Sequence, residues 1–206
     1  MKYEDFVLKV SPYPVFGEDV LSTLGLSKAG RRLQLNRWSQ AGKVIRLKRG
    51  LYSLPEDRRK SPLSVRWLAN ALYSPSYVSL EYMLSWYDMI PERVGMVTSI
   101  TTLKTATFKN TLGQFVYRNI KKDLFFGFEE VHDEFGSSVL VATPEKAILD
   151  TIYLYSGWKS SREFLEKNLR LQQLDQLNKK RLKAFAAKFS SKKIEMATKL
   201  LLEIML

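Results

Sequence analysis

Arginine, lysine, asparagine and glutamine residues gather in one stretch of the chain, and these side chains are suited to contact DNA. Arginine and lysine neutralise phosphates and donate to guanine, and asparagine and glutamine form paired hydrogen bonds with adenine. The candidates are Lys28, Arg31, Arg32, Gln34, Asn36, Arg37, Lys43, Arg46, Lys48 and Arg49. Carried on one surface, they could hold a duplex by its backbone and read some of its bases.

The positive charge of the chain is concentrated in the same region. Between residues 28 and 60, eleven Lys and Arg stand against two acids, which accounts for +9 of the net charge of +12. A local field of this kind is typical of a phosphate-binding surface, because cations that neutralise phosphates release condensed counterions. A solvated basic surface on an ordinary domain is the alternative. The secondary structure that carries these charges distinguishes a phosphate-binding surface from a solvated one.

The stretch that follows residue 43 has the pattern of a β-hairpin. The apolar Ile45 and Leu47 alternate with two basic residues. One face can therefore be buried while Arg46 and Lys48 point outward. Gly50 supplies the backbone freedom that a tight turn needs, which leaves the preceding arginine near the tip, where it could reach a narrow minor groove.

Helical patterns precede this hairpin. A short amphipathic helix is predicted over Tyr3–Val10, and a second over Val15–Leu24, with Phe16 on its apolar face. Gly25 is well placed to end it and Ser27 to cap the next helix, so the turn between the two has the spacing of a helix-turn-helix. Together with the hairpin, these elements predict an N-terminal winged helix-turn-helix whose last helix is the recognition helix.

The rotation of the recognition helix is left open by the sequence. Leu35, Trp38 and Ala41 fall on one side, but Leu33 lies far round the helix from them. The polar candidates on this helix therefore cannot all face DNA at once. Trp38 is expected to pack in the core, because a tryptophan at helical spacing from a leucine usually does so.

The stretch from 55 to 62 has a proline at each end and no apolar residue between, which indicates a linker. We therefore predict a DNA-binding domain at residues 1–58 and a second domain at residues 59–206. An α+β fold is predicted for the chain as a whole.

The second domain is expected to begin with a helix over 65–73 and a break over 75–79, from which Ser79 caps another helix. Runs rich in β-branched and aromatic residues follow, at Met96–Thr102, Thr105–Lys109, Gln114–Ile120, Phe125–Val131 and Ser138–Ala142. If sequential strands pair, they form a small, mostly antiparallel sheet. Thr143 is expected to cap a helix, and the pattern after Gly157 is helical to the end of the chain.

Several classes of protein are disfavoured. The chain has no cysteine, and hence no disulfide framework, thiol nucleophile or cysteine zinc site. Charged residues interrupt any signal-peptide core, at Lys2, Glu4, Asp5 and Lys9. No apolar run is long enough to span a bilayer. We expect a soluble, cytoplasmic protein without a membrane partner.

A metal-dependent nuclease is the enzymatic alternative. The only histidine, His132, is surrounded by four carboxylates, those of Glu129, Glu130, Asp133 and Glu134, which could bind a divalent metal for phosphodiester cleavage. The cluster falls in a predicted hairpin turn, however, where acids are ordinarily solvated. A carboxylate-x-Lys arrangement, paired histidines and a glycine-rich phosphate loop are all missing from the sequence. We therefore expect no catalytic residue, no metal and no cofactor.

Three segments, in this order, carry a resemblance to a known family. They are RGLYSLP at 49–55, ALYSPSYVSLEYML at 71–84 and VATPEKAILD at 141–150. With the helix-turn-helix ahead of them, the region from about 15 to 155 resembles the AbiEi antitoxins of bacterial abortive-infection systems. The resemblance implies a winged-helix domain that binds operator inverted repeats and represses its own toxin-antitoxin operon, and a second domain with antitoxin activity. It further implies a nucleotidyltransferase-like toxin as functional partner, without a stable complex being required.

The resemblance also carries over to individual positions. It matches residues 28–37 to the recognition helix, and the wing to Lys43, Arg46, Lys48 and Arg49. In the second domain the recurring segments contain Ser79, Glu81, Glu145, Lys146 and Asp150, for which helix caps and intramolecular ion pairs are the favoured interpretation.

Two further features bear on partners. Eight Lys and Arg against one acid between residues 179 and 199 are interpreted as a solvated helix face. An inverted repeat has two half-sites, which permits an oligomer on DNA. The alternative to a repressor is a protein-interaction module whose basic surfaces dock an acidic partner.

Overall fold

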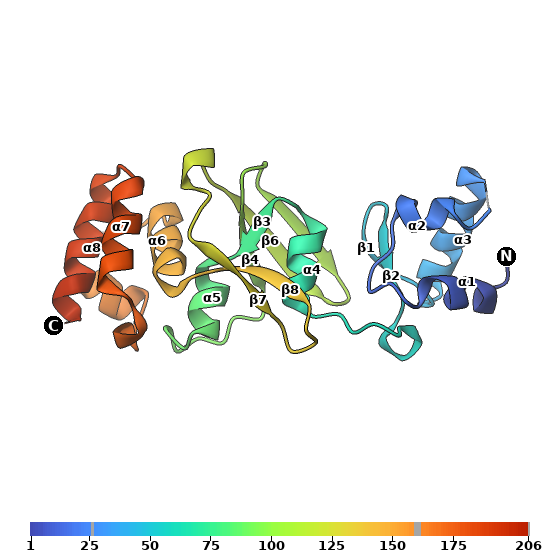
Figure 1. Cartoon of the computed structure of the whole chain (residues 1–206), viewed down its shortest axis with the longest axis horizontal. Helices are drawn as coiled ribbons and strands as arrows, with labels where there is room; N and C mark the ends of the chain where they lie inside the picture. Colours follow the sequence, from blue (N-terminus) through green and yellow to red (C-terminus); the bar gives the residue numbers. More distant parts are fainter. Residues whose placement is uncertain (26, 159–161, 206) are drawn as a thin grey trace.

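The chain is of the α+β class, as predicted, with a small antiparallel sheet of two strands and a mixed sheet of six. The computed structural model describes residues 1–25, 27–158 and 162–205. Figure 1 shows the first three helices and the small sheet at one end of the molecule, the mixed sheet in the middle and the last two helices at the other end.

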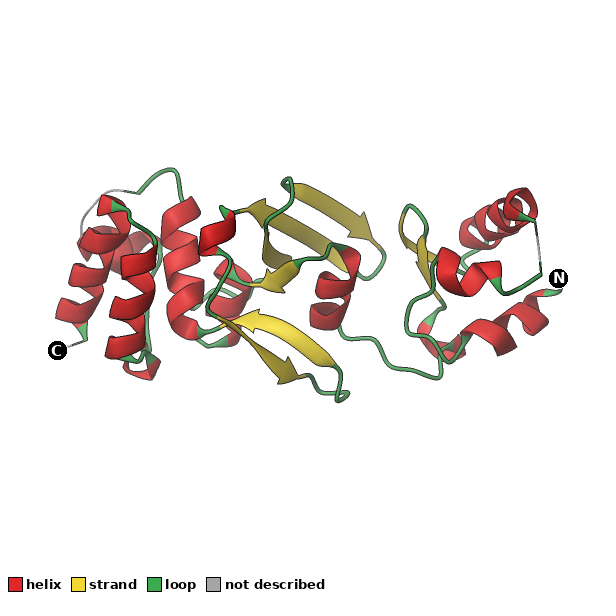
Figure 2. Ribbon diagram, turned by 45° about the horizontal axis from the view of Figure 1, so that its top comes forward, coloured by secondary structure: helices red, strands yellow, loops and turns green. Residues whose placement is uncertain are grey.

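The helices and strands are coloured separately in Figure 2. They are α1 (Tyr3–Val10), α2 (Glu18–Ser22), α3 (Lys28–Gln40), β1 (Ile45–Lys48), β2 (Leu51–Ser53), α4 (Val65–Leu72), β3 (Ser76–Val78), α5 (Leu80–Trp86), β4 (Val97–Thr101), β5 (Ala106–Asn110), β6 (Gly113–Asn119), β7 (Phe128–His132), β8 (Ser138–Ala142), α6 (Pro144–Leu154), α7 (Lys179–Lys188) and α8 (Lys192–Ile204). Part of the helical pattern predicted after Gly157 falls on 159–161 and 206, outside the described residues. No described helix is both long and apolar enough to cross a membrane.

The predicted signals between α2 and α3 are confirmed. Gly25 adopts a φ of +71°, which suits a glycine that ends a helix. Ser27 caps α3, since its side-chain oxygen accepts a hydrogen bond from the amide of Gly30 at 3.1 Å. Trp38 packs as expected, with its ring 4.6 Å from that of Phe6.

The second helix is shorter than predicted. The pattern indicated a helix from 15 to 24, whereas α2 covers only Glu18–Ser22. Phe16 instead forms a bridge to Tyr52 of β2, through two backbone hydrogen bonds of 2.8 and 3.0 Å. This pairing requires an extended backbone at Phe16, and a helix cannot begin there. Leu21 and Leu24 are nevertheless buried, as their helical spacing predicted.

The predicted hairpin forms, with one correction. β1 and β2 pair antiparallel, and Gly50 makes the turn with a φ of +79°. The register shifts between Arg46 and Lys48, a bulge that disturbs the strict alternation of side chains. Arg46 is exposed, but Lys48 Nζ donates a hydrogen bond to the carbonyl oxygen of Leu72 at 2.5 Å. The prediction that both cations point outward is therefore wrong for Lys48.

The inner face of the hairpin contacts the rest of the chain. Leu47 is buried among residues of the larger core, not in the core of the N-terminal helices. The side-chain amide of Asn110, on β5, donates to the carbonyl oxygen of Leu47 at 3.2 Å. In the predicted linker, the amide of Lys60 donates to the carbonyl oxygen of Ser11 at 3.0 Å. The division into residues 1–58 and 59–206 stays a prediction.

The large sheet has the order β5-β6-β4-β3-β8-β7 and is mixed, with more antiparallel than parallel pairings. β6 pairs with β4 and β3 with β8 in parallel, while the other three pairings are antiparallel. Sequential strands pair only in part: β5 pairs with β6 and β7 with β8, whereas β4 pairs with β6 in parallel and not with β5. Residues 76–78, predicted as a break, form β3 between β4 and β8 in the middle of the sheet. All three residues of β3 are buried, so they lack the alternation that marks a half-exposed strand.

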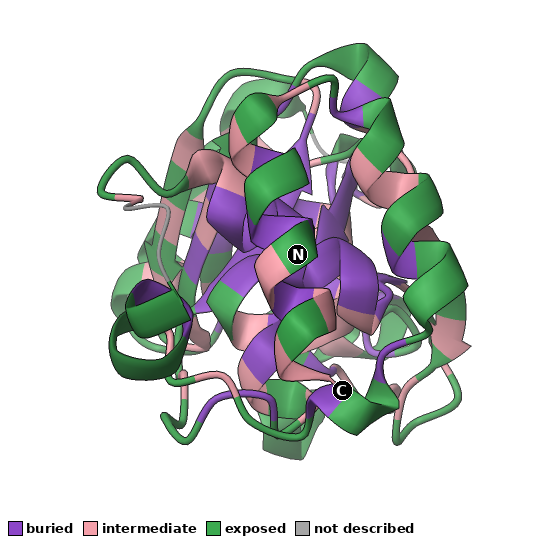
Figure 3. Ribbon diagram, turned by 90° about the vertical axis from the view of Figure 1, so that its left-hand side faces the viewer, coloured by how far each residue is buried: buried purple, intermediate pink, exposed green. Residues whose placement is uncertain are grey.

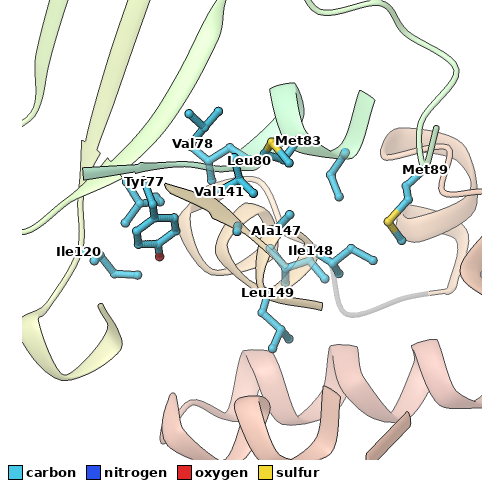
Figure 4. Close-up of a cluster of buried hydrophobic side chains, with 14 of the residues drawn as sticks. Tyr77, Val78, Leu80, Met83, Met89, Ile120, Val141, Ala147, Ile148 and Leu149 are labelled. Atoms are coloured by element: carbon cyan, nitrogen blue, oxygen red, sulfur yellow. The ribbon is translucent and has the colours of Figure 1, made fainter. Parts of the chain in front are cut away.

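Helices α4, α5 and α6 pack against this sheet and share its core. Figure 4 shows side chains of β3, α5, β8 and α6 meeting there, among them Tyr77, Met83, Val141 and Ile148. The outer faces of the helices at the C-terminal end are largely exposed around a buried interior (Figure 3).

Candidate nucleic-acid interface

One side of α3 is exposed along its whole length. Its exposed residues are Lys28, Ala29, Arg32, Leu33, Asn36, Arg37 and Gln40. They recur at alternating steps of one and three, which places them on a single face of a helix. We call them the outer stripe. Leu35 lies outside the stripe and is 4% exposed, whereas Leu33 is 54% exposed. The rotation of α3, which the sequence left open, is thereby fixed.

The outer stripe and the hairpin enclose a groove of about 450 Å³. Its lining residues are Ala29, Arg32, Leu33, Leu35, Asn36 and Ser39 from α3, and Arg46 and Tyr52 from the hairpin. Three of the predicted site residues, Arg32, Asn36 and Arg46, therefore meet on one concave surface. Two guanidinium groups and an amide placed together can bind an anion and donate to, or accept from, the edge of a base.

Two predicted site residues lie on the inner side of α3. The guanidinium of Arg31 forms an ion pair with Glu18 of α2, and the Arg31 side chain is 11% exposed. Gln34 Nε2 donates a hydrogen bond to the carbonyl oxygen of Met1 at 3.1 Å. Both side chains thus hold α3 against the helices behind it, and neither lines the groove.

The remaining predicted residues lie around the groove or away from it. Lys28 and Arg37 belong to the outer stripe, and Arg49 is exposed at the hairpin turn. Lys43 follows α3, with its Nζ 5.0 Å from the centroid of the Tyr3 ring. Lys48 Nζ lies 5.9 Å from the centroid of the Phe108 ring on β5, and burial lowers its pKa below the ordinary value for lysine.

Part of the positive charge of residues 28–60 is neutralised locally, outside the groove. Besides the ion pair of α2 with α3, Arg58 lies 3.6 Å from Glu4 and 3.4 Å from Asp57. Within the described parts of the chain, no carboxylate pairs with Arg32 or Arg46. The groove therefore keeps its cations available for an external anion.

Three of the five second-domain residues singled out from the sequence, Ser79, Lys146 and Asp150, belong to a buried polar network. Lys146 and Asp150, one turn apart on α6, are both 0% exposed and form an ion pair. Asp150 Oδ2 also accepts hydrogen bonds from the hydroxyl groups of Tyr77 and Ser79, each at 2.9 Å. Ser79 precedes α5 but does not cap it, contrary to the prediction, because its hydroxyl group is bonded to Asp150.

Aromatic rings surround the cation of this network. Lys146 Nζ lies 5.6, 5.0 and 4.9 Å from the ring centroids of Tyr77, Phe126 and Phe189. Burial lowers the pKa of Lys146 and raises that of Asp150, while their mutual attraction opposes both shifts. The network is closed to solvent, and it holds α6 against β3 and the end of α7.

Glu145 forms the second predicted ion pair of this region. Its carboxylate is 0% exposed, lies 2.7 Å from Arg181 Nε and accepts the backbone amide of Asn178 at 2.7 Å. These bonds join α6 to the start of α7. The interpretation of Glu145, Lys146 and Asp150 as intramolecular ion pairs is therefore confirmed, while Glu81 is exposed on α5.

Two of the carboxylates next to His132, those of Asp133 and Glu134, have structural partners. Asp133 accepts hydrogen bonds from Ser64 Oγ at 2.5 Å and from two backbone amides of the following turn. Burial raises the pKa of Asp133, but these hydrogen bonds outweigh it and the pKa is lowered. Glu134 pairs with Arg66 of α4. Among the residues that the structure describes, no group of three or more His, Asp or Glu could hold a metal ion.

Five groove residues were not among the predicted site residues: Ala29, Leu33, Leu35, Ser39 and Tyr52. Tyr52 carries no polar signal beyond its own hydroxyl group, and it lines the groove only because the hairpin folds back towards α3. The signal for Leu33 was its position far round the helix from the buried face. An apolar residue that fits neither the core face nor a charge pattern belongs to the outer surface.

No protein-family model matches this chain, and a search among curated proteins finds no similar sequence.

Proposed function

We propose that the chain is a winged helix-turn-helix protein that binds duplex DNA through α3 and the β1–β2 hairpin. The observation that supports this most directly is the groove in which Arg32, Asn36 and Arg46 meet beside a fully exposed helix face. A solvated basic surface does not require its cations to converge with an amide in a concavity. A DNA-reading surface does, because phosphate contacts position the protein while base contacts select the sequence.

The dimensions of α3 suit this role. Its 13 residues span about 20 Å, and the major groove is wide enough to admit a helix. In the proposed complex the outer stripe enters the major groove, where Asn36 can form paired hydrogen bonds with adenine and Arg32 with guanine. Arg49, at the hairpin turn, would lie over the adjacent minor groove or backbone.

We further propose that the protein is the repressor and antitoxin of an AbiE-like toxin-antitoxin system. The support is the resemblance in three segments of the chain. Two of these segments meet in the buried network: Tyr77 and Ser79 come from 71–84, and Lys146 and Asp150 from 141–150. These similar residues are therefore buried and stabilise the second domain. In the proposed antitoxin role they act by keeping this domain folded, and they do not contact a toxin themselves.

DNA binding is tested by titrating the full chain with defined and random duplexes at several salt concentrations. Arg49→Ala is expected to weaken binding to every duplex and to reduce the slope of log K against log salt by about one. Arg32→Ala is expected to relax the preference at particular base pairs, by about 1–3 kcal/mol. Arg118→Ala removes the same charge from an exposed position on β6 and serves as the control.

Two outcomes would contradict the proposal. Equal effects of Arg32→Ala and Arg49→Ala on every sequence would refute the assignment of α3 to the major groove. Binding without sequence preference at moderate salt would instead favour the alternative, a protein-interaction module with basic surfaces.

The repressor and antitoxin roles need a separate test in cells. A reporter placed behind the chain's own upstream region should be repressed by the wild type, and the repression should be lost with Arg46→Ala. Growth arrest by a neighbouring nucleotidyltransferase-like gene product should be relieved by the full chain. Failure to relieve it would refute the antitoxin role and leave DNA binding intact.

A further inference from the structure

We infer that Leu33 is a specificity-determining residue, whose side chain contacts the 5-methyl group of a thymine in the major groove. The inference rests on the proposed function and adds to it the chemical identity of one base. It predicts that the preferred duplex contains an A·T pair that is recognised by an apolar contact and not by a hydrogen bond.

The first argument is the position of Leu33 within the outer stripe. Residues four apart stack along a helix, so the stripe has two neighbouring columns. One column is polar throughout: Lys28, Arg32, Asn36 and Gln40. The other begins with two apolar residues, Ala29 and Leu33, and ends with Arg37. Leu33 therefore lies at the middle of the face that would enter the DNA, with polar side chains beside it.

The second argument is that Leu33 is not needed to hold the protein together. The buried side of α3 is supplied by Leu35 and Trp38, and Leu33 is 54% exposed. A single exposed leucine is common on protein surfaces and carries little information by itself. Leu8 of α1 is even more exposed, at 69%, but it is not part of the groove lined by Arg32 and Arg46. Leu33 differs because it shares its groove with Arg32 and Arg46.

The third argument is the positive charge beside Leu33, which favours DNA as the partner that covers this side chain. The guanidinium groups of Arg32 and Arg46 attract phosphates, and a duplex held by its phosphates brings base edges against the centre of the stripe. Among these edges in the major groove, only thymine offers a methyl group, while guanine, adenine and cytosine present hydrogen-bonding atoms. A polar edge placed against Leu33 would lose its water without gaining a partner, and the site would reject it.

The experiment begins with selection of preferred duplexes from a random pool by the full chain. Each thymine of the selected duplex is then replaced by deoxyuridine, which removes only the 5-methyl group, and binding is measured at fixed salt. At one thymine the replacement should weaken binding by the wild type about fourfold, the loss expected for one buried methyl group. Leu33→Ala should bind the thymine and uracil duplexes equally at that position. Leu8→Ala should keep the fourfold difference.

The outcomes separate this inference from the function on which it rests. A pool that yields no preferred duplex overturns the proposed function, and the inference with it. A preferred duplex in which no thymine is sensitive to removal of its methyl group overturns the inference alone. Sensitivity that persists in Leu33→Ala also overturns it, because another residue must then contact the methyl group. Sensitivity of the wild type to uracil is measured on one protein and does not depend on the folding of a variant, and Leu33→Ala counts only if it still binds the thymine duplex.

Discussion

Replacing Lys146 by methionine should destabilise the protein by about 3–5 kcal/mol at pH 7, because it leaves the carboxylate of Asp150 buried without its cation. Methionine is close in length to lysine, so the space between the aromatic rings stays filled and the change is mainly electrostatic. Asp150 would retain two hydrogen bonds, from the hydroxyl groups of Tyr77 and Ser79. These do not replace a positive charge in a site that is 0% exposed.

The destabilisation by Lys146→Met has an upper limit, because the carboxyl group of Asp150 can bind a proton and become neutral. Protonating a carboxyl whose ordinary pKa is 3.8 costs about 4 kcal/mol at pH 7 and about 2 kcal/mol at pH 5. Burial raises the pKa of Asp150 in the folded state, so the folded variant binds the proton more readily than the unfolded chain. The destabilisation should therefore shrink as the pH falls from 7 to 5.

Urea unfolding of the full chain at pH 7 and pH 5 provides the test. Lys188→Met is the matched control, because Lys188 Nζ lies 4.5 Å from the Phe126 ring centroid but is exposed and adjoins no buried carboxylate among the described residues. It should change the free energy of unfolding by less than about 0.5 kcal/mol. Adding Asp150→Asn to Lys146→Met should restore most of the loss at pH 7, since a neutral amide oxygen can still accept both hydroxyl hydrogen bonds. An Lys146→Met variant as stable as the wild type, or a penalty independent of pH, would refute this account.

Three other predictions concern stability. Gly127 and Gly136 have φ of +74° and +77°, but only at Gly127 would an added Cβ approach other side chains, at 2.9 and 3.1 Å. Urea unfolding should therefore show a loss of about 1 kcal/mol for Gly136→Ala and a clearly larger one for Gly127→Ala, and equal losses would contradict the steric argument. The lowered pKa of Asp133 gives stability that is present above its ordinary pKa of 3.8 and is lost as the pH falls through the folded value. Asp133→Asn should abolish that part of the acid dependence, as measured by unfolding between pH 5 and pH 2, and an unchanged profile would exclude the carboxylate as its source. Leu47→Ala should lower the free energy of unfolding by about 2–5 kcal/mol, and Leu33→Ala by less than about 0.5 kcal/mol. Both variants remove the same atoms, but Leu47 is in the core and Leu33 is on the surface. Similar losses in urea unfolding would contradict the burial of Leu47.

Local signals in the sequence predicted much of the secondary structure correctly. Ser27 and Thr143 were identified as helix caps, and their hydroxyl groups accept the expected amides. Gly25 and Gly50 were identified at a helix end and a turn, and both have positive φ. Each of these features depends on a few neighbouring residues, and a pattern over a few positions is enough to specify it.

Features that depend on distant partners were missed. Residues 76–78 form a strand only because β4 and β8 lie on either side of them, and three buried residues offer no alternation to recognise. Phe16 is drawn out of its expected helix by Tyr52. Lys48 is turned inward by the shift of register in the hairpin. In each case tertiary pairing overrides a local preference.

The sequence indicated which types of side chain the candidate site contains, but not which of them lie together on one surface. The sequence suggested ten candidate residues, and three of them, Arg32, Asn36 and Arg46, line the groove. Arg31 and Gln34 have the same side-chain chemistry as their neighbours, and only the position of α2 and of the chain start decides that they face inward. A sequence gives the types of side chain on a helix, but the face that stays exposed depends on what packs against it.

The burial of Leu47 in the larger core has a consequence for the order of events during synthesis. The hairpin is made early, but the strand β5 that receives its inner face emerges from the ribosome later. Until then a nascent chain displays an uncovered apolar patch, which is a target for chaperones and for misassembly. The N-terminal end of this protein is therefore completed only after translation has passed residue 110, and an N-terminal fragment ending at residue 58 would carry its hairpin unsupported.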